Sequence, residues 1–305
     1  MTEIAHGVEP AASDATLPLF TGFEPLRIQT SGASIYGVRG GSGPPLLLLH
    51  GWPQTHAEWH YIAPRLARDF TVVATDLRGY GDSGKPEDGV GHAGHCKRAM
   101  AQDQVELMQQ LGFERFAVVG HDRGGRVGHR MALDHAERVT RLAVLDIVPT
   151  LEVYSTVTKA LATAYYHWFF LIQPAPLPET LIRGKEEFLL RAVLRGQVPK
   201  NISEAVFQDY LRCMRQDGTL HAMCEDYRAG ASLDLEHDRA DLERKIACPL
   251  LVLWGEKGAM HRLYDVSATW RARASDVRAQ GLDCGHWMPE ELPDAVYAQL
   301  HQFLT

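Results

Sequence analysis

The sequence has no apolar run long enough to cross a bilayer, and its first ten residues contain neither a basic leader nor an apolar core. We therefore expect no transmembrane segment and no secretory signal. Cysteine is also scarce, and an odd number without paired spacing argues against a disulfide framework. This pattern predicts a reducing, cytoplasmic location. The five cysteines are Cys96, Cys213, Cys224, Cys248 and Cys284.

Positive charge is in short supply as well. The formal net charge is -7, and no basic face that could bind a polyanion is visible along the chain. A role in nucleic-acid binding is therefore not expected, and an anionic small molecule would have to be bound by local arginines. The length of 305 residues, with 45% hydrophobic and 23% charged residues, is that of an ordinary globular chain with a large core.

Short apolar segments alternate with helical patterns in the first half of the chain, which predicts a mostly parallel sheet flanked by helices. After residue 149 the sheet pattern stops for about a hundred mostly helical residues. We predict an α/β core over residues 21–149 and 246–305, a helical cap over 150–245, and a loose tail over 1–20. The expected strands are 46–50, 71–76, 116–121, 142–146, 250–254 and 277–282, and the clearest expected helices are 97–111 and 125–135.

An aspartate stands at the tip of the segment Gly120-His121-Asp122-Arg123-Gly124, where an elbow between a strand and a helix would carry a nucleophile. A carboxylate at this position displaces a leaving group from an sp³ carbon and leaves an ester on the enzyme, whereas serine attacks a carbonyl carbon. The pattern favours dehalogenation or epoxide opening over ester hydrolysis. The structural alternative is that Asp122 only caps the following helix.

A histidine follows the last expected strand, at the position of the general base in an elbow enzyme. This is His286, and it needs an acid to orient it. Asp146 ends a strand at the carboxyl edge of the sheet and is the preferred acid; Glu256 is the alternative, and Asp146 could instead be a simple turn cap.

The loop His50-Gly51-Trp52-Pro53 follows the first buried strand. The backbone N–H groups of Trp52 and Arg123 are the candidate oxyanion hole, which stabilises the charge that forms when the ester is hydrolysed. We expect His50 to order this loop, and His121 to satisfy backbone groups, instead of transferring protons.

Arg123 and Arg126 lie three residues apart, which places both guanidinium groups on one face of a helix beside Asp122. Together they form a candidate clamp for a substrate carboxylate. A neutral epoxide would give them nothing to bind. The alternative for this pair is a solvated face or ion pairs with acids of the core.

In these segments the chain resembles the fluoroacetate dehalogenases of the α/β-hydrolase superfamily. The resemblance covers nearly the whole chain after the tail, and it implies the roles given above for the nucleophile, the base, its acid and the arginine clamp. It also implies a halide pocket in the cap, which sequence pattern alone would have read as aromatic packing. The segments are residues 121–126, 145–150, 167–168 and 224–228, and the implied halide donors are His167, Trp168 and Tyr227.

The sequence therefore predicts hydrolytic conversion of fluoroacetate into glycolate and fluoride, through an ester of Asp122 and water activated by His286. No cofactor and no metal are expected, and the family resemblance implies a homodimer. Three alternatives remain: a dehalogenase limited to chloro and bromo acids, an epoxide hydrolase that pairs Tyr227 with Tyr154 or Tyr166, and a ligand receptor on a hydrolase scaffold.

Overall fold

Eight strands form one sheet in the order β1-β2-β4-β3-β5-β6-β7-β8 in the computed structural model, which describes residues 19–198 and 200–305. The strand β2 pairs antiparallel with both β1 and β4, and every other pair is parallel. The predicted α/β architecture with a mostly parallel sheet is confirmed. The strands are β1 (Phe23–Gln29), β2 (Ser34–Gly40), β3 (Pro45–Leu49), β4 (Thr71–Thr75), β5 (Phe116–His121), β6 (Val139–Leu145), β7 (Leu250–Gly255) and β8 (Val277–Leu282).

The central strands are covered on both faces, which explains their continuous apolar sequences. Every residue of β4 and β5 is buried. The sequence prediction missed β1 and β2, because β1 alternates between exposed and partly buried residues and contains a proline that is tolerated only at an edge.

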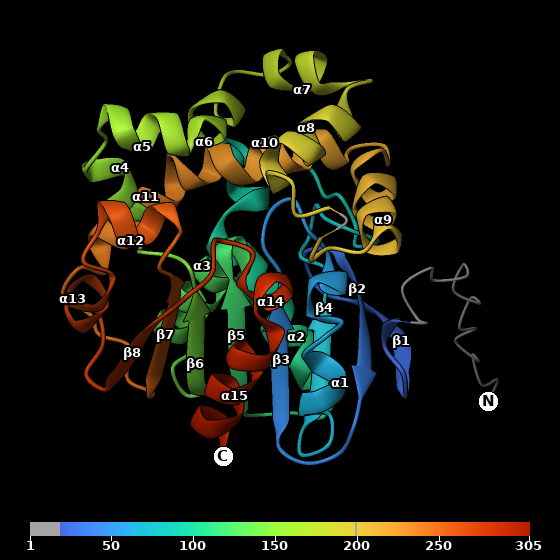
Figure 1. Cartoon of the computed structure of the whole chain (residues 1–305), viewed down its shortest axis with the longest axis vertical. Coiled ribbons are helices and arrows are strands. Elements are labelled where there is room, and N and C mark those ends of the chain that lie inside the picture. Colours follow the sequence, from blue (N-terminus) through green and yellow to red (C-terminus); the bar gives the residue numbers. More distant parts are fainter. Residues whose placement is uncertain (1–18, 199) are drawn as a thin grey trace, which may run out of the picture.

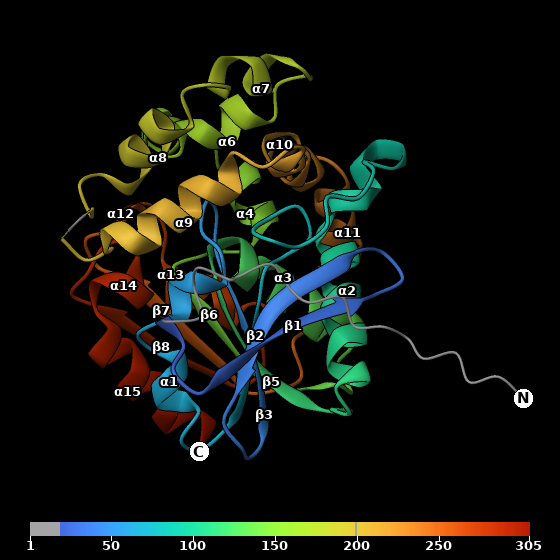
Figure 2. The same cartoon turned by 90° about the vertical axis from the view of Figure 1, so that its right-hand side faces the viewer.

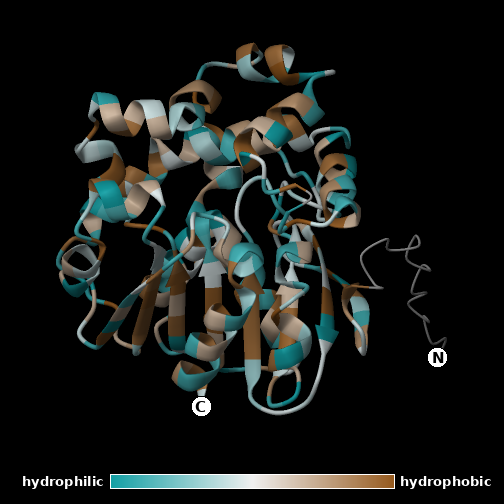
Figure 3. Cartoon of the chain, in the orientation of Figure 1, coloured by the Kyte–Doolittle hydropathy of each residue, from teal (hydrophilic) through white to brown (hydrophobic). Residues whose placement is uncertain are grey.

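Two hydrophobic clusters lie on the two faces of the sheet. The helices α2 (Lys97–Gln110) and α3 (Asp122–Asp134) pack against one face, and α1 (Ala63–Leu66) and α15 (Pro293–Leu304) cover the other (Figure 1). The apolar strands between these two helical layers stand out in the hydropathy colouring of Figure 3. The remaining helical elements of the two sheet halves are η2 (His56–Trp59), η3 (Val90–His95), α12 (Ala259–Leu263), α13 (Val266–Arg271) and α14 (Met288–Glu291).

The segment between β6 and β7 consists of helices joined by loops and lies above the carboxyl ends of the parallel strands (Figures 1 and 2). This arrangement places the strand ends between the sheet and the helices, where an α/β protein binds its ligand. The helices are α4 (Thr150–Ser155), α5 (Lys159–Ala164), α6 (Tyr166–Leu171), α7 (Leu177–Ile182), α8 (Glu186–Leu194), α9 (Glu204–Met214), α10 (Thr219–Gly230) and α11 (Leu233–Ala240).

Most of the predicted N-terminal tail, residues 1–18, lies outside the described residues. The last residue of that tail is not loose, because Phe20 is buried against the rings of Phe23 and His56. Within the described ranges, no helix combines the length and the apolar character that a membrane crossing requires.

Candidate active site

The sharp turn from β5 into α3 presents the side chain of Asp122 at the carboxyl edge of the sheet. Asp122 has a φ of 42°, in the left-handed region that a residue with a Cβ rarely adopts. The turn also needs two glycines, because a Cβ at Gly120 would collide with the backbone of Gly124, and one at Gly124 with the backbone of Leu49. A backbone held in such a conformation is typical of functional sites. The helix therefore begins at Asp122, three residues earlier than predicted.

The Asp122 carboxylate is ionised although it is only 4% exposed. Burial raises the pKa of this carboxyl, but His286, Arg126 and His121 outweigh burial and lower the pKa to about 2. The backbone N–H of Trp52 donates to Oδ1 of Asp122 at 3.2 Å. This contact places one predicted oxyanion donor beside the carboxyl carbon that water would attack.

The imidazole of His286 is hydrogen-bonded through Nδ1 to Oδ2 of Asp146 at 2.5 Å. Asp146 follows β6 with a φ of 50°, and its Oδ1 accepts the N–H of Gly255 at 3.0 Å. Since Nδ1 is engaged by the carboxylate, Nε2 is the nitrogen left to exchange a proton with a substrate or water. The partner of His286 is thus the residue that the sequence favoured, and not the alternative Glu256.

The two neighbouring histidines make contacts that hold backbone in place, as the sequence analysis expected. The ring of His50 accepts the N–H of Leu77 through Nε2 at 3.1 Å, and its Nδ1 lies 2.8 Å from the Gly51 carbonyl oxygen. The ring of His121 donates through Nε2 to the carbonyl oxygen of His286 at 2.8 Å. The contact of His121 fixes the loop that carries the candidate base.

A second function of His121 was not visible in the sequence. Its Nδ1 lies 2.8 Å from Oε1 of Glu58, and both side chains are fully buried. Burial opposes protonation, but the Glu58 carboxylate outweighs burial and raises the pKa of His121 to about 9. His121 is therefore a cation at neutral pH, and its charge helps to keep Asp122 ionised.

The guanidinium of Arg123 is paired with a buried acid that the sequence did not identify as its partner. Its Nε and Nη2 donate to the two carboxylate oxygens of Asp226 at 2.8 and 2.5 Å. Asp226 also accepts from Tyr80 and from the ammonium of Lys97. The sequence analysis gave an ion pair with a core acid as the alternative role of this arginine, and the structure contains such a pair.

Arg126 differs from Arg123 in the groups that it binds. Its Nη1 donates to the Val148 carbonyl oxygen at 2.9 Å and to Oγ1 of Thr150 at 3.1 Å. Its buried Nε has no hydrogen-bond partner among the described residues, and its Cζ lies 4.6 Å from the centre of the Trp168 ring. Arg126 therefore keeps an unused donor that an anionic ligand could take.

The three residues implied as halide donors lie together. The ring centres of His167 and Trp168 are 6.0 and 5.9 Å from that of Tyr227. Within the described part of the chain, Nε1 of Trp168 and the hydroxyl of Tyr227 are buried without a partner. Burial lowers the pKa of His167 to about 3, so this ring is neutral at pH 7 and keeps one N–H donor.

Two further unpartnered donors lie beside this group, of which the sequence analysis named only Tyr154, as a donor to an epoxide. The indole Nε1 of Trp52 and the hydroxyl of Tyr154 are also buried without a partner among residues 19–198 and 200–305. Trp52 stacks on His167 at 4.8 Å, and Tyr154 contacts Trp168 at 5.3 Å. Trp52 had been considered only for its backbone. Tyr166, in contrast, is 46% exposed, which makes it a poor donor to a buried leaving group.

A cavity of about 530 Å³ reaches Asp122 and His286 and is also lined by Trp52 and His167. The two arginines, Trp168 and Tyr227 are buried and do not line it; Arg123 lies over the ring of Tyr227 and Arg126 over that of Trp168. Four basic side chains of its wall were not noticed in the sequence, because they come from separate segments. They are Arg195, Lys200, Lys257 and Arg262.

Comparison with known proteins gives a consistent result. The family model described as the alpha/beta hydrolase fold matches residues 44–293. A fluoroacetate dehalogenase from Burkholderia sp. is 45% identical over 94% of this chain and 95% of its own length. A soluble epoxide hydrolase from Corynebacterium sp. is 36% identical over 87% of this chain and 92% of its own length.

Solved structures agree with the fold described above. The crystal structure of an α/β hydrolase from Nostoc sp. superposes with a TM-score of 0.92 and is 57% identical, covering 94% of this chain and 99% of that one.

Proposed function

The chain belongs to the α/β-hydrolase fold family and is a hydrolase, and on that premise we propose that it hydrolyses haloacetates, converting fluoroacetate into glycolate and fluoride. The observation that carries the proposal is the buried, ionised Asp122 carboxylate on the elbow, followed on the same helix by Arg123 and Arg126. The identity to a fluoroacetate dehalogenase supports the same substrate class.

In the proposed first step a carboxylate oxygen of Asp122 attacks the α-carbon of the haloacetate. The carbon–halogen bond breaks, the halide leaves with the electron pair, and an ester of Asp122 forms. Arg126, with Arg123 beside it, holds the substrate carboxylate by charge-assisted hydrogen bonds and so aligns the α-carbon. The guanidinium of Arg123 contributes a fixed charge, because Asp226 orients it.

The leaving fluoride needs hydrogen-bond donors to replace its water shell. We assign this role to His167, Trp168 and Tyr227, of which the last two have unpartnered buried donors. The helical segment 150–245 acts as the cap that supplies these three side chains above the elbow.

In the second step His286 takes a proton from water through Nε2, and the hydroxide attacks the carboxyl carbon of the Asp122 ester. The bond between that carbon and the ester oxygen breaks, the imidazolium of His286 returns its proton to the leaving oxygen, and glycolate leaves. The new Asp122 carboxyl group loses its proton to solvent and is a carboxylate again. The backbone N–H groups of Trp52 and Arg123 stabilise the oxyanion that forms in between, and Asp146 stabilises the imidazolium.

The experiment that tests this scheme is a single turnover in ¹⁸O-labelled water with enzyme in excess over fluoroacetate. Labelled oxygen is expected in the peptide that contains Asp122, and the first glycolate is expected to be unlabelled. With excess substrate the label then passes into glycolate. Label in the first glycolate, with none in Asp122, would mean direct attack by water, and absence of halide release from every haloacetate would reject the substrate class.

Epoxide hydrolysis is the second candidate, since the hydroxyls of Tyr154 and Tyr227 are both buried without partners in the described ranges and could donate to an epoxide oxygen. The identity to a soluble epoxide hydrolase favours it as well. A diol-forming assay on styrene oxide, run beside the fluoride assay, separates the two. Diol formation without halide release would replace the first proposal by the second.

A further inference from the structure

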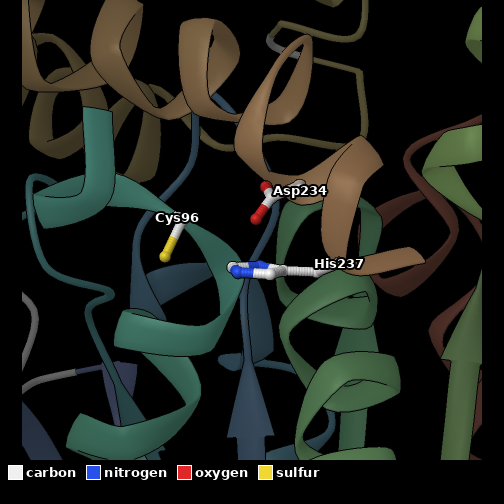
Figure 4. Close-up of side chains that lie close together, drawn as sticks. All are labelled: Cys96, Asp234 and His237. Atoms are coloured by element: carbon white, nitrogen blue, oxygen red, sulfur yellow. The ribbon is translucent and has the colours of Figure 1, made fainter. Parts of the chain in front are cut away.

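Three side chains that could bind a metal ion converge between the sheet half of the molecule and the helices above it, outside the cavity that reaches Asp122. Cys96 precedes α2, whereas Asp234 and His237 lie on α11. Their sulfur, oxygen and nitrogen atoms all lie within 4.8 Å of one another, and Figure 4 shows the three side chains pointing into a common space. We propose that Cys96, Asp234 and His237 bind a Zn²⁺ ion.

The positions of the ligands favour this assignment. Asp234 and His237 are three residues apart on a helix, so both project from the same face. Around one zinc ion, thiolate, imidazole and carboxylate atoms lie roughly 3 to 4 Å apart, since each is about 2.0 to 2.3 Å from the metal. Small rotations of the three side chains would therefore bring them to bonding distance.

Unused polar atoms are the second and independent observation. Asp234 is only 4% exposed, and its Oδ2 has no hydrogen-bond partner among the described residues. The buried Nδ1 of His237 has none either. The other carboxylate oxygen, Oδ1, accepts the backbone N–H of Lys97 at 2.9 Å, which fixes the orientation of the group. A buried oxygen and a buried nitrogen that make no hydrogen bond, next to a buried thiol, are the atoms that a bound cation would satisfy.

One cation already lies near this space. The ammonium of Lys97 is 3.7 Å from Oδ2 of Asp234, beyond hydrogen-bonding distance, and it is engaged more closely by Asp226. Lys97 therefore forms an ion pair with Oδ2 but no hydrogen bond, and a metal ion bound there would share this carboxylate with the ammonium.

A second group of possible metal ligands, Asp88, His221 and Glu225, differs because its atoms already have partners. In it, His221 contacts Asp88 at 2.9 Å through Nε2 and Glu179 at 3.0 Å through Nδ1. Glu225 is held by Arg228 and by His92 at 2.8 and 2.6 Å. Because these atoms satisfy one another, this group is an ion-pair network and needs no metal.

The ligand types select the metal. A thiolate with an imidazole and one carboxylate suits Zn²⁺, and three protein ligands leave the fourth tetrahedral position for water. Cys96 loses its thiol proton to solvent when it binds. The site connects α2 with α11, so bound zinc would also stabilise the packing of these two helices. The proposal does not depend on the dehalogenase assignment.

The test uses the untagged full-length protein, treated with EDTA, dialysed, kept reduced with a phosphine, and titrated with Co²⁺ as a spectroscopic substitute for Zn²⁺. We expect one equivalent to produce a thiolate-to-cobalt charge-transfer band in the near ultraviolet, together with the visible bands of a tetrahedral ion. Zinc should abolish both signals by displacing cobalt, and should raise the melting temperature of the protein.

Three variants, each checked for folding by circular dichroism, make the test specific. Cys96→Ser should lose the charge-transfer band and the thermal shift, and His237→Ala should bind at least ~10-fold more weakly. The matched control His221→Ala should behave as the parent protein. The proposal is overturned if the parent protein shows no charge-transfer band. It is also overturned if Cys96→Ser binds cobalt as tightly as the parent, or if His221→Ala abolishes binding.

Discussion

Arg126 is the most informative residue to replace, because its role is the one that separates an acid-specific enzyme from an epoxide hydrolase. In the structure Nη1 of Arg126 already binds Val148 and Thr150, so Nε and Nη2 remain for a substrate carboxylate. The substitution Arg126→Gln removes the charge and the two remaining donors while keeping a polar group at the position.

The expected loss follows from these two bonds. A hydrogen bond to a charged group contributes about 1.5 to 3 kcal/mol, and the two bonds of one guanidinium are not additive. A total of about 3 kcal/mol corresponds to a fall in kcat/KM of roughly a hundredfold. We expect this loss for fluoroacetate, measured as initial rates of fluoride release with an ion-selective electrode.

The control is the same substitution one turn further along α3. Arg130 is as buried as Arg126, but within the described ranges its ion pairs are with Asp134, Asp238 and Asp241, none of which belongs to the site. Arg130→Gln should lower the melting temperature, because it removes the ion pairs that this buried guanidinium makes with three part-buried acids, while kcat/KM changes by less than about threefold. The reasoning fails if Arg126→Gln retains wild-type kcat/KM, or if both variants lose activity equally.

Three further predictions follow from the site. Replacement His286→Asn should permit one equivalent of halide release and leave a mass adduct on Asp122, and steady turnover of this variant would refute the role of the base. Trp168→Phe removes one unpartnered donor. It should slow fluoride release by roughly tenfold and bromide release less, because fluoride loses more hydration when it leaves water. Equal effects on both rates would argue against a halide pocket. Glu290 is buried beside Glu58, and burial followed by that carboxylate raises its pKa to about 8. Because the folded state holds this proton more tightly than the unfolded state, stability should fall as pH rises from about 4.5 to 8, by up to a few kcal/mol. The melting temperature of Glu290→Gln should vary less over that range. Parallel plots of melting temperature against pH for the two proteins would contradict this.

The sequence could predict those parts of the site that local geometry determines. The elbow residue Asp122 is recognisable because the turn needs small neighbours on both sides, and His286 because it follows the last strand. The central strands were recognisable because burial on both faces leaves them continuously apolar. For the same reason the half-exposed edge strand β1 gave no clear signal.

Partners that are distant in the sequence could not be predicted. Arg123 and Asp226 are 103 positions apart, and nothing in either segment indicates that they meet. The same holds for the pairing of His121 with Glu58 and for the group formed by Cys96 and Asp234. Such contacts depend on how loops and helices from distant segments pack over the sheet, and periodicity does not encode this packing. The halide donors were identified only through resemblance to a family, since aromatic residues at helical spacing normally indicate a core.

The distribution of charge gives the arginine pair a second role. The proposed reaction brings an anionic substrate against Asp122, which is itself an anion. Two such charges about 4 Å apart repel each other by about 4 kcal/mol at an effective dielectric constant near 20. The charges of Arg123 and of the protonated His121 are largely balanced by Asp226 and Glu58, so Arg126 must offset most of this repulsion. A neutral substrate of the same shape, such as chloroacetamide, meets no such repulsion. Replacement of Arg126 should therefore lower kcat/KM much less for chloroacetamide than for chloroacetate. An equal loss for both substrates would show that Arg126 acts through the structure of the site and not through its charge.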